Sequence, residues 1–213
     1  MDGRCIIVGA GDFYGFHSMP APGDYLIAAD AGYRWCTQQQ VIPDLVVGDF
    51  DSLKNAPDHP NIIRLPVEKD DTDTLAAIRL GLEKGYRQFE LYGVTGGRPD
   101  HTIANLQCLL FLHRHGARGT MYGNGIVYRG ICCETVSFPA SARGDFSLFC
   151  LDGTARGVTI RGLKYETTDA VITSDYPVGC SNSFRGIPSS VTVEDGSLIA
   201  IYSEKVECDH ADL

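Results

Sequence analysis

The stretch "DLVVGDFDSL", residues 44–53, decides the fold class. Its apolar run at 45–47 predicts a short buried strand. Two carboxylates, Asp49 and Asp51, follow this strand one residue apart. Side chains at i and i+2 of an extended backbone point the same way, so we expect this pair to face one spot. Like charges about 4 Å apart repel by about 4 kcal/mol at an effective dielectric of 20, so we expect a cation between them.

Similar apolar runs recur along the first half of the chain, at 5–9, 25–29, 61–65, 89–93 and 119–123. Helical patterns lie between several of these runs. The clearest extends from Thr72 to Lys84, with Asp71 as its cap and Gly85 as its stop. A second extends from about His101 to His115, and a shorter one follows Asp30. Strands that alternate with helices predict a mostly parallel sheet with helices on both faces.

The pattern changes after Gly125. Short runs rich in β-branched and aromatic residues then follow one another, separated by turn residues and without a helical pattern. This texture predicts a small antiparallel sandwich or barrel. We therefore expect one domain over residues 1–124 and a second over residues 125–213.

Composition limits the function. The net charge is −9, which argues against nonspecific nucleic-acid binding. No run of about 18 apolar residues is present, so no transmembrane helix is expected. The apolar run near the N-terminus is too short for a signal peptide, and we expect a cytoplasmic protein. The eight cysteines contain no CxxC pair, which favours small buried hydrophobic side chains over a disulfide framework or a zinc site.

Acidic residues follow several of the expected strands. Asp30 follows the run at 25–29, and the block "KDDTD" (69–73) follows the run at 61–65 and opens a helix. One acid at a helix start needs no function, but three exceed what capping requires. Because ligands of a parallel sheet bind at the carboxyl ends of its strands, we expect these acids to meet at one rim. Clustered carboxylates beside a polyphosphate suit Mg²⁺.

The block "GVTGGRPDH" (93–101) supplies the complementary half of such a site. Gly96 and Gly97 let backbone N–H groups approach a ligand closely, and Arg98 adds a planar fork of donors. The helix expected to begin at Asp100 or His101 offers an N-terminus that suits an anion. The block therefore predicts a grip on a polyphosphate.

Two common nucleotide-binding motifs are excluded. The P-loop pattern GxxxxGK[ST] does not occur in the sequence. The stretch "GAGDFYG" (9–15) follows a strand but places Tyr14 where the third glycine of GxGxxG belongs, so a dinucleotide site is not expected. This loop can still form an edge of a nucleotide pocket.

Five blocks together resemble the thiamine pyrophosphokinase family: "ADAG" (29–32), "GDFDS" (48–52), "KDDTD" (69–73), "TGGRPDHTIAN" (95–105) and "GCSNSF" (179–184). The resemblance implies an α/β fold with an N-terminal, mostly parallel, Rossmann-like three-layer domain that binds nucleotide and magnesium. A C-terminal antiparallel β-sandwich domain would bind thiamine and form a homodimer with active sites shared between subunits. The implied reaction transfers a pyrophosphoryl group from ATP to the thiamine hydroxyl, giving thiamine diphosphate and AMP.

The same resemblance assigns residues to roles. It implies Mg²⁺ as the cofactor, with metal ligands Asp49, Asp51, Asp70 and Asp73. The expected catalytic residues are Asp49, Asp51, Asp73, Arg98 and Asp100, with Asp100 or Asp51 as the acceptor of the hydroxyl proton. The expected nucleotide-binding residues are Asp30, Lys69, Thr72, Gly96, Gly97, Arg98, His101 and Asn105. Ser181 and Asn182 are expected to contact thiamine. We expect Asp51→Asn to remove activity and leave the fold intact.

The sequence departs from the family pattern at two positions, with Ala31 in place of a glycine and Ser183 in place of a glutamate. Two other functions remain open. "LVVGDFDSL" also resembles the strand and DxD signature of aspartyl-nucleophile phosphatases, in which Asp49 would be phosphorylated. That signature usually follows the first strand, whereas this one does not. A non-catalytic nucleotide-sensing module is the other alternative, and the large number of carboxylates speaks against it.

Overall fold

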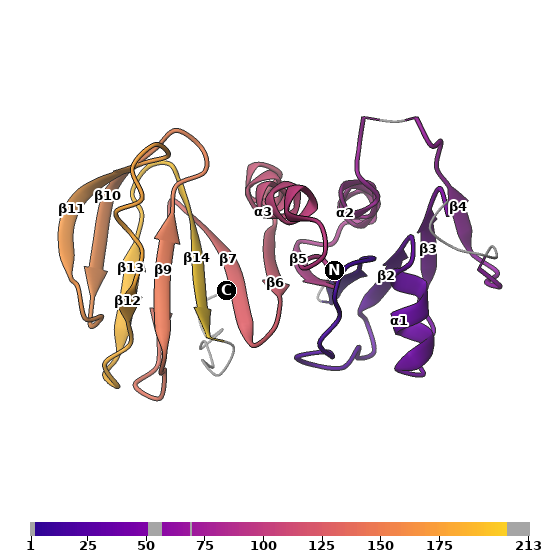
Figure 1. Cartoon of the computed structure of the whole chain (residues 1–213), viewed down its shortest axis with the longest axis horizontal. Helices are drawn as coiled ribbons and strands as arrows, with labels where there is room; N and C mark the ends of the chain where they lie inside the picture. Colours follow the sequence, from indigo (N-terminus) through magenta and orange to yellow (C-terminus); the bar gives the residue numbers. More distant parts are fainter. Residues whose placement is uncertain (1–2, 51–56, 69, 204–213) are drawn as a thin grey trace. The chain divides into compact units, whose positions relative to one another are not determined.

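The structure is a computed structural model of the chain, and it describes residues 3–50, 57–68 and 70–203. Asp51 and Lys69, both expected in the site, lie outside the described residues. The chain divides into two compact units, Met1–Asn124 and Gly125–Leu213, which are coloured along the sequence in Figure 1. The division falls near Gly125, where the alternation of strand and helix patterns gives way to short strand-like runs.

The first unit is a parallel α/β unit. Its elements are β1 (Arg4–Val8), β2 (Tyr25–Ala29), α1 (Gly32–Gln38), β3 (Leu45–Gly48), β4 (Ile62–Arg64), α2 (Asp73–Glu83), β5 (Gln88–Tyr92), α3 (Pro99–Arg114) and β6 (Arg118–Tyr122). The strands lie in the order β6-β5-β1-β2-β3-β4 and all their pairings are parallel. The chain enters the sheet at β1, adds strands on one side as far as β4, and then returns to the other side with β5. The carboxyl ends of β1 and β5 therefore form the switch point at which open α/β sheets bind ligands.

Helices cover both faces of this sheet, as the alternation of elements predicts (Figure 1). Ile6 and Val8 of β1 pack in one cluster with Cys36 of α1. Cys5 points to the opposite face, because side chains alternate along a strand. There α2 approaches so closely that a Cβ on Gly81 would lie 2.6 Å from the Cys5 Sγ atom. The burial of both faces explains why these strands read as continuous apolar runs.

Two helix starts differ from the sequence prediction. Helix α2 is capped by Thr72, whose Oγ1 accepts a hydrogen bond from the Leu75 N–H at 3.2 Å, and not by Asp71. A side-chain oxygen at the cap position reaches the N–H three residues on, and Thr72 occupies that position because the helix begins at Asp73. Helix α3 begins at Pro99 and not at Asp100 or His101. Proline has no backbone N–H, and an N–H in the first turn of a helix would have no partner within the helix.

The second unit consists of two antiparallel sheets. Its strands are β7 (Ile126–Cys132), β8 (Thr135–Phe138), β9 (Asp145–Phe149), β10 (Thr154–Arg161), β11 (Thr167–Thr173), β12 (Asn182–Ser183), β13 (Ser189–Thr192) and β14 (Ser197–Ser203). One sheet contains β12-β9-β14-β7 and the other contains β11-β10-β13-β8. Phe138 of the second sheet packs against Phe146 and Tyr202 of the first, with ring centroids 5.4 and 5.3 Å apart. Of the two alternatives, the structure therefore has the sandwich, with aromatic side chains between its sheets.

The cysteines agree only in part with the expectation of buried hydrophobic side chains. All those in the described residues are free, and Cys5, Cys36, Cys108 and Cys150 are buried. Cys133 and Cys180 are exposed. Cys133 lies in the connection between β7 and β8, and Cys180 lies in the connection between β11 and β12. Among the described residues no helix is both long and apolar enough to span a membrane.

Candidate active site

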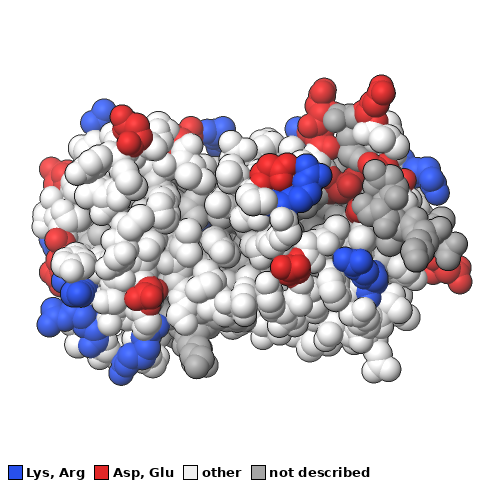
Figure 2. Space-filling model, in the orientation of Figure 1, with Lys and Arg blue, Asp and Glu red and all other residues white. Residues whose placement is uncertain are grey.

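A pocket of about 440 Å³ lies at the switch point of the parallel sheet. Its walls come from segments that follow β1, β2, β3 and β5 and from the first turns of α2 and α3. Figure 2 shows acidic side chains above α2 in this view. The pocket therefore lies where the sheet topology predicts a ligand.

Asp30 occupies the end of β2 and is only 6% exposed. Its backbone adopts a positive φ of 48°, and its N–H donates to the Val47 carbonyl at 2.8 Å. The Oδ1 atom is buried and has no hydrogen-bond partner among the described residues. A buried carboxylate oxygen without a partner is costly. Asp30 is thus placed to accept a hydrogen bond from a ligand or to bind a cation.

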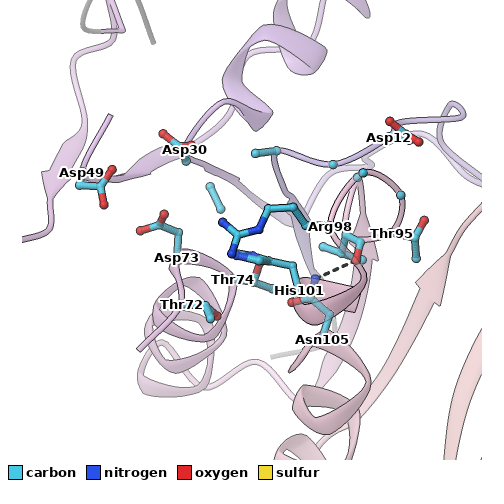
Figure 3. Close-up of a pocket in the computed structure, with 17 residues that line it drawn as sticks. Asp12, Asp30, Asp49, Thr72, Asp73, Thr74, Thr95, Arg98, His101 and Asn105 are labelled. Atoms are coloured by element: carbon cyan, nitrogen blue, oxygen red, sulfur yellow. Dashed lines mark hydrogen bonds between the residues drawn. The ribbon is translucent and has the colours of Figure 1, made fainter. Parts of the chain in front are cut away.

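Asp49 and Asp73 bring two further carboxylates to the same end of the pocket (Figure 3). Asp49 follows β3, and Asp73 is the first residue of α2, next to its cap Thr72. Figure 3 shows Asp30, Asp49 and Asp73 gathered on one side of the cavity. Three separate segments therefore supply this acidic end, as the rim argument predicts.

The extended backbone expected between Asp49 and Asp51 is not found at Phe50, and Asp51 itself lies outside the described residues. Strand β3 ends at Gly48, and Phe50 has a positive φ of 62°, so the backbone here is not extended. The buried Phe50 side chain joins the apolar cluster on the α1 face, and the Arg64 guanidinium lies 5.4 Å from its ring centroid. Packing of Phe50 has overridden the alternation of an extended strand.

The loop after β5 forms the next wall of the pocket. Gly96 and Gly97 line it with positive φ values of 82° and 64°, which side chains rarely tolerate. Asn105 of α3 is buried, and its Nδ2 donates to the Val94 carbonyl at 2.7 Å. Asn105 therefore fixes the start of the loop, while His101 lines the pocket one turn earlier on the same helix.

Arg98 and Asp100 form a two-bond ion pair with each other. Arg98 Nη2 donates to Asp100 Oδ2 at 2.6 Å, and Nε donates to Oδ1 at 3.3 Å. Both side chains are exposed, and only Arg98 lines the pocket. The hydrogen bond from Arg98 lowers the pKa of the Asp100 carboxyl below its ordinary value, which makes Asp100 a weaker base.

The structure does not bring all the expected residues together. Asp70 and Asp100 are exposed and do not line the pocket. Within residues 3–50, 57–68 and 70–203, no group of three His, Cys, Asp or Glu side chains is close enough to hold a metal ion by itself. Magnesium usually takes only one or two protein carboxylates and completes its shell with water and phosphate oxygens, so this geometry remains compatible with Mg²⁺.

Other lining residues were not assigned from the sequence. Asp12 follows β1, Thr74 follows Asp73, and Thr95 precedes the glycine pair. The stretch "GAGDFYG" can form a pocket edge by the sequence analysis, and the structure adds that Asp12 is one of its lining residues. No local pattern marks it, because its position depends on the neighbouring strand β5.

Ser181 and Asn182 lie in the second unit, around β12. Asn182 is buried, and its amide is used within the protein: Oδ1 accepts from the N–H groups of Tyr165 and Ser183 at 2.9 Å, and Nδ2 donates to the Tyr165 carbonyl at 2.8 Å. Ser181 is exposed with a positive φ of 61°. Asn182 therefore holds the segment at Tyr165 in place.

Comparison with known proteins gives both units the same family. A family model described as "Thiamin pyrophosphokinase, catalytic domain" matches residues 16–120, and one described as "Thiamin pyrophosphokinase, vitamin B1 binding domain" matches residues 136–198. A curated thiamine pyrophosphokinase of Bacillus subtilis (strain 168) is 34% identical over 89 residues. That match spans 39% of this chain and 42% of the relative's length.

Solved structures show the same fold along nearly the whole chain. The thiamine pyrophosphokinase structure from Bacillus subtilis has a TM-score of 0.83 and 22% identity, and the match covers 94% of this chain and 98% of that one. The structure of a thiamin pyrophosphokinase family protein from Enterococcus faecalis has a TM-score of 0.79 and 25% identity, with the same coverage. Since the two family models together match most of the sequence and both units, the chain belongs to the thiamin pyrophosphokinase family.

Proposed function

We propose that the protein transfers the pyrophosphoryl group of ATP to the hydroxyl group of thiamine, giving thiamine diphosphate and AMP. The observation that carries this proposal is the acidic end of the pocket, where Asp30, Asp49 and Asp73 meet at the switch point of the sheet. Arg98 lines the same pocket, and the family match extends to the second unit. Pyrophosphoryl transfer requires positioning and charge neutralisation more than covalent chemistry.

Magnesium is the proposed cofactor, and the donor set fits it. Asp30 Oδ1 is buried without a partner among the described residues, and oxygen donors of this kind suit a hard cation. One or two of the three carboxylates at the acidic end, Asp30, Asp49 and Asp73, would hold the ion together with water and phosphate oxygens. Asp51 and Asp70 remain predicted ligands from the resemblance. Bound Mg²⁺ would neutralise charge on the polyphosphate.

Arg98 would orient the polyphosphate, and the glycine turn beside Asp12 would border the rest of the nucleotide. The guanidinium is exposed and already paired with Asp100, so phosphate oxygens can replace that carboxylate without uncovering a buried charge. Asp100 would then lose the Arg98 hydrogen bond that lowers its pKa in the free protein. Asp100 and Asp51 both stay predicted acceptors of the thiamine hydroxyl proton.

The two alternative functions are less favoured. An aspartyl-nucleophile phosphatase would need Asp49 as a covalent nucleophile, and the family match does not point there. A sensing module would have no need of the acidic end beside Arg98. Thiamine binding at Ser181, a homodimer with shared active sites and a cytoplasmic location stay part of the proposal.

The test is to incubate the purified protein with magnesium, ATP and thiamine and to identify the nucleotide product by chromatography. We expect AMP and thiamine diphosphate in equal amounts, formed only when thiamine and magnesium are both present. ADP as the product would indicate a kinase, and phosphate release without thiamine would indicate a phosphatase. Nucleotide binding without turnover would leave the sensing module.

A further inference from the structure

The loop after β1, residues 9–12, forms a pocket wall that the proposed mechanism does not use. Three of its backbone donors are occupied by the segment at the end of β5: the N–H of Gly9 donates to the Tyr92 carbonyl at 2.8 Å, that of Gly11 to the Gly93 carbonyl at 2.7 Å, and that of Asp12 to the Thr95 carbonyl at 2.8 Å. These amides are therefore not available to a phosphate group. The polar side chain that the loop offers a ligand is the carboxylate of Asp12.

Asp12 lies away from the other carboxylates of the pocket. Figure 3 shows Asp12 beside Thr95, at the end opposite Asp30, Asp49 and Asp73. Its carboxylate lies over the glycine turn, where a Cβ on Gly96 would overlap it. The side chain is exposed, and the Tyr14 hydroxyl donates to its Oδ2 at 3.3 Å. The Asp12 carboxylate is therefore a hydrogen-bond acceptor at this end of the cavity.

The charge of Asp12 indicates which part of a nucleotide can lie beside it. A carboxylate repels phosphate oxygens and has only acceptor oxygens to offer at neutral pH. Arg98 and a cation at the acidic end of the pocket would attract the polyphosphate to the side of the pocket opposite Asp12. The nucleoside is then the part that reaches Asp12, and its hydroxyl groups are donors.

We propose that Asp12 accepts hydrogen bonds from the ribose hydroxyls of ATP and thereby selects ribonucleotides over deoxyribonucleotides. This inference rests on the proposed use of ATP. A carboxylate has two acceptor oxygens, and the neighbouring 2′- and 3′-hydroxyls supply two donors. A carboxylate also binds the ribose hydroxyl in dinucleotide-binding sheets, where it follows the glycine loop by about 20 residues. Asp12 would be a specificity-determining residue and would take no part in the transfer itself.

The test is calorimetric titration of the wild-type protein and of Asp12→Asn with the magnesium complexes of ATP, 2′-deoxyATP, 3′-deoxyATP and ITP, in the absence of thiamine. Wild type should bind a deoxy nucleotide about 10-fold more weakly than ATP, since a hydrogen bond to a charged group is lost. Asp12→Asn should bind ATP more weakly and no longer distinguish ATP from the deoxy nucleotides. Asp58→Asn, the same change at an exposed residue outside the pocket lining, should behave as wild type.

The outcomes separate this inference from the proposed function. An unchanged ratio of ATP to deoxyATP affinity in a folded Asp12→Asn would overturn it, and so would a loss of discrimination against ITP alone, which would mean that Asp12 contacts the base amine. Failure of wild type to bind any of the nucleotides would overturn the proposed function itself. Thermal unfolding of each variant shows whether it is folded, and Asp12→Glu, which keeps the charge but moves it, should restore part of the discrimination.

Discussion

Trp35 Nε1 donates a hydrogen bond to the Gly11 carbonyl at 3.0 Å, which ties helix α1 to the pocket wall that carries Asp12. The Phe13 ring stacks on the indole at a centroid distance of 5.9 Å. Trp35 is the one tryptophan of the chain, so its emission reports on this wall alone.

We expect the fluorescence of Trp35 to change when MgATP binds, because a ligand beside Gly11 and Asp12 alters the surroundings of the indole. The measurement is a titration of emission with MgATP, compared with calorimetry on the same protein. Trp35→Phe serves as the control without signal, and the loss of its hydrogen bond should cost about 1 kcal/mol of stability. Constant emission at a nucleotide concentration that calorimetry shows to be saturating would contradict the position of this wall.

Asp73→Asn should lower kcat/KM by about 100-fold or more, the effect expected when one charge-stabilising group of a transfer site is removed. The shape of the side chain is kept, so the thermal unfolding temperature should stay close to that of wild type. Asp71→Asn is the matched control, because Asp71 is paired with Arg79 at 2.9 Å outside the pocket lining. Breaking this exposed pair should cost less than about 1 kcal/mol and leave activity unchanged.

Asp70→Asn tests whether Asp70 binds the metal, as the resemblance implies, or has no role in the site. The resemblance assigns Asp70 to the metal, whereas the structure places it exposed and outside the pocket lining. A loss as large as that of Asp73→Asn would support the metal assignment of Asp70. An activity like that of Asp71→Asn would show that Asp73 alone of this block serves the site.

Asp24 should make stability depend on pH. Its side chain is 7% exposed and forms an ion pair of 2.5 Å with Arg4, while its Oδ1 accepts from the Arg4 N–H at 2.8 Å. Burial alone would raise the pKa of Asp24, but the hydrogen bonds from Arg4 outweigh it and the pKa is lowered. A lowered pKa stabilises the fold above the unfolded value of about 3.9, and this stabilisation is lost as the pH falls through the folded pKa.

Asp24→Asn should therefore lower the free energy of unfolding by about 1.5–3 kcal/mol at pH 7, the usual worth of hydrogen bonds to a charged group. The difference between variant and wild type should begin to shrink as the pH falls below about 4, where Asp24 is protonated in the unfolded state, and should vanish at the lower pH at which the folded state is protonated too. Urea unfolding of both proteins between pH 3 and pH 7 measures it. A difference that stays constant over this range would show that the charge of Asp24 contributes nothing.

Asn182→Ala should destabilise the fold by about 1–3 kcal/mol, because two partly buried N–H groups and one carbonyl would lose their partner. Asn182→Asp is the matched variant, since it keeps the acceptor for the N–H groups of Tyr165 and Ser183 and loses only the donor. Its carboxylate would face the Tyr165 carbonyl, so its stability should also fall. The measurement is chemical unfolding of each variant, followed by the KM for thiamine.

Ser181→Ala tests whether the Ser181 side chain contacts thiamine, apart from the structural role of the neighbouring Asn182. Ser181 is exposed, and its side chain can be removed at little cost to stability. A raised KM for thiamine in Ser181→Ala at wild-type stability would assign the contact to Ser181. If Asn182→Ala changes neither stability nor KM, the hydrogen bonds of its amide have no structural value.

The sequence by itself determined the elements and their order. Apolar runs and helical spacing are local properties, so the strands from β1 to β6 and the helices α2 and α3 could be placed within one or two residues. The change of texture after Gly125 indicated the antiparallel part. The acids that follow β2 and β3 or open α2 indicated the rim of the site.

Only the tertiary structure decided which of these residues share one pocket. The order of strands brings the loops after β1 and β5 together, and this places Asp12 beside Thr95 although they are far apart in the chain. Packing of the buried Phe50 side chain accompanies a bend of the backbone after β3. The side chain of Asn182 is buried because its amide forms hydrogen bonds with the backbone of Tyr165. These contacts join distant segments, and their free energy exceeds the local preferences from which a sequence pattern is read.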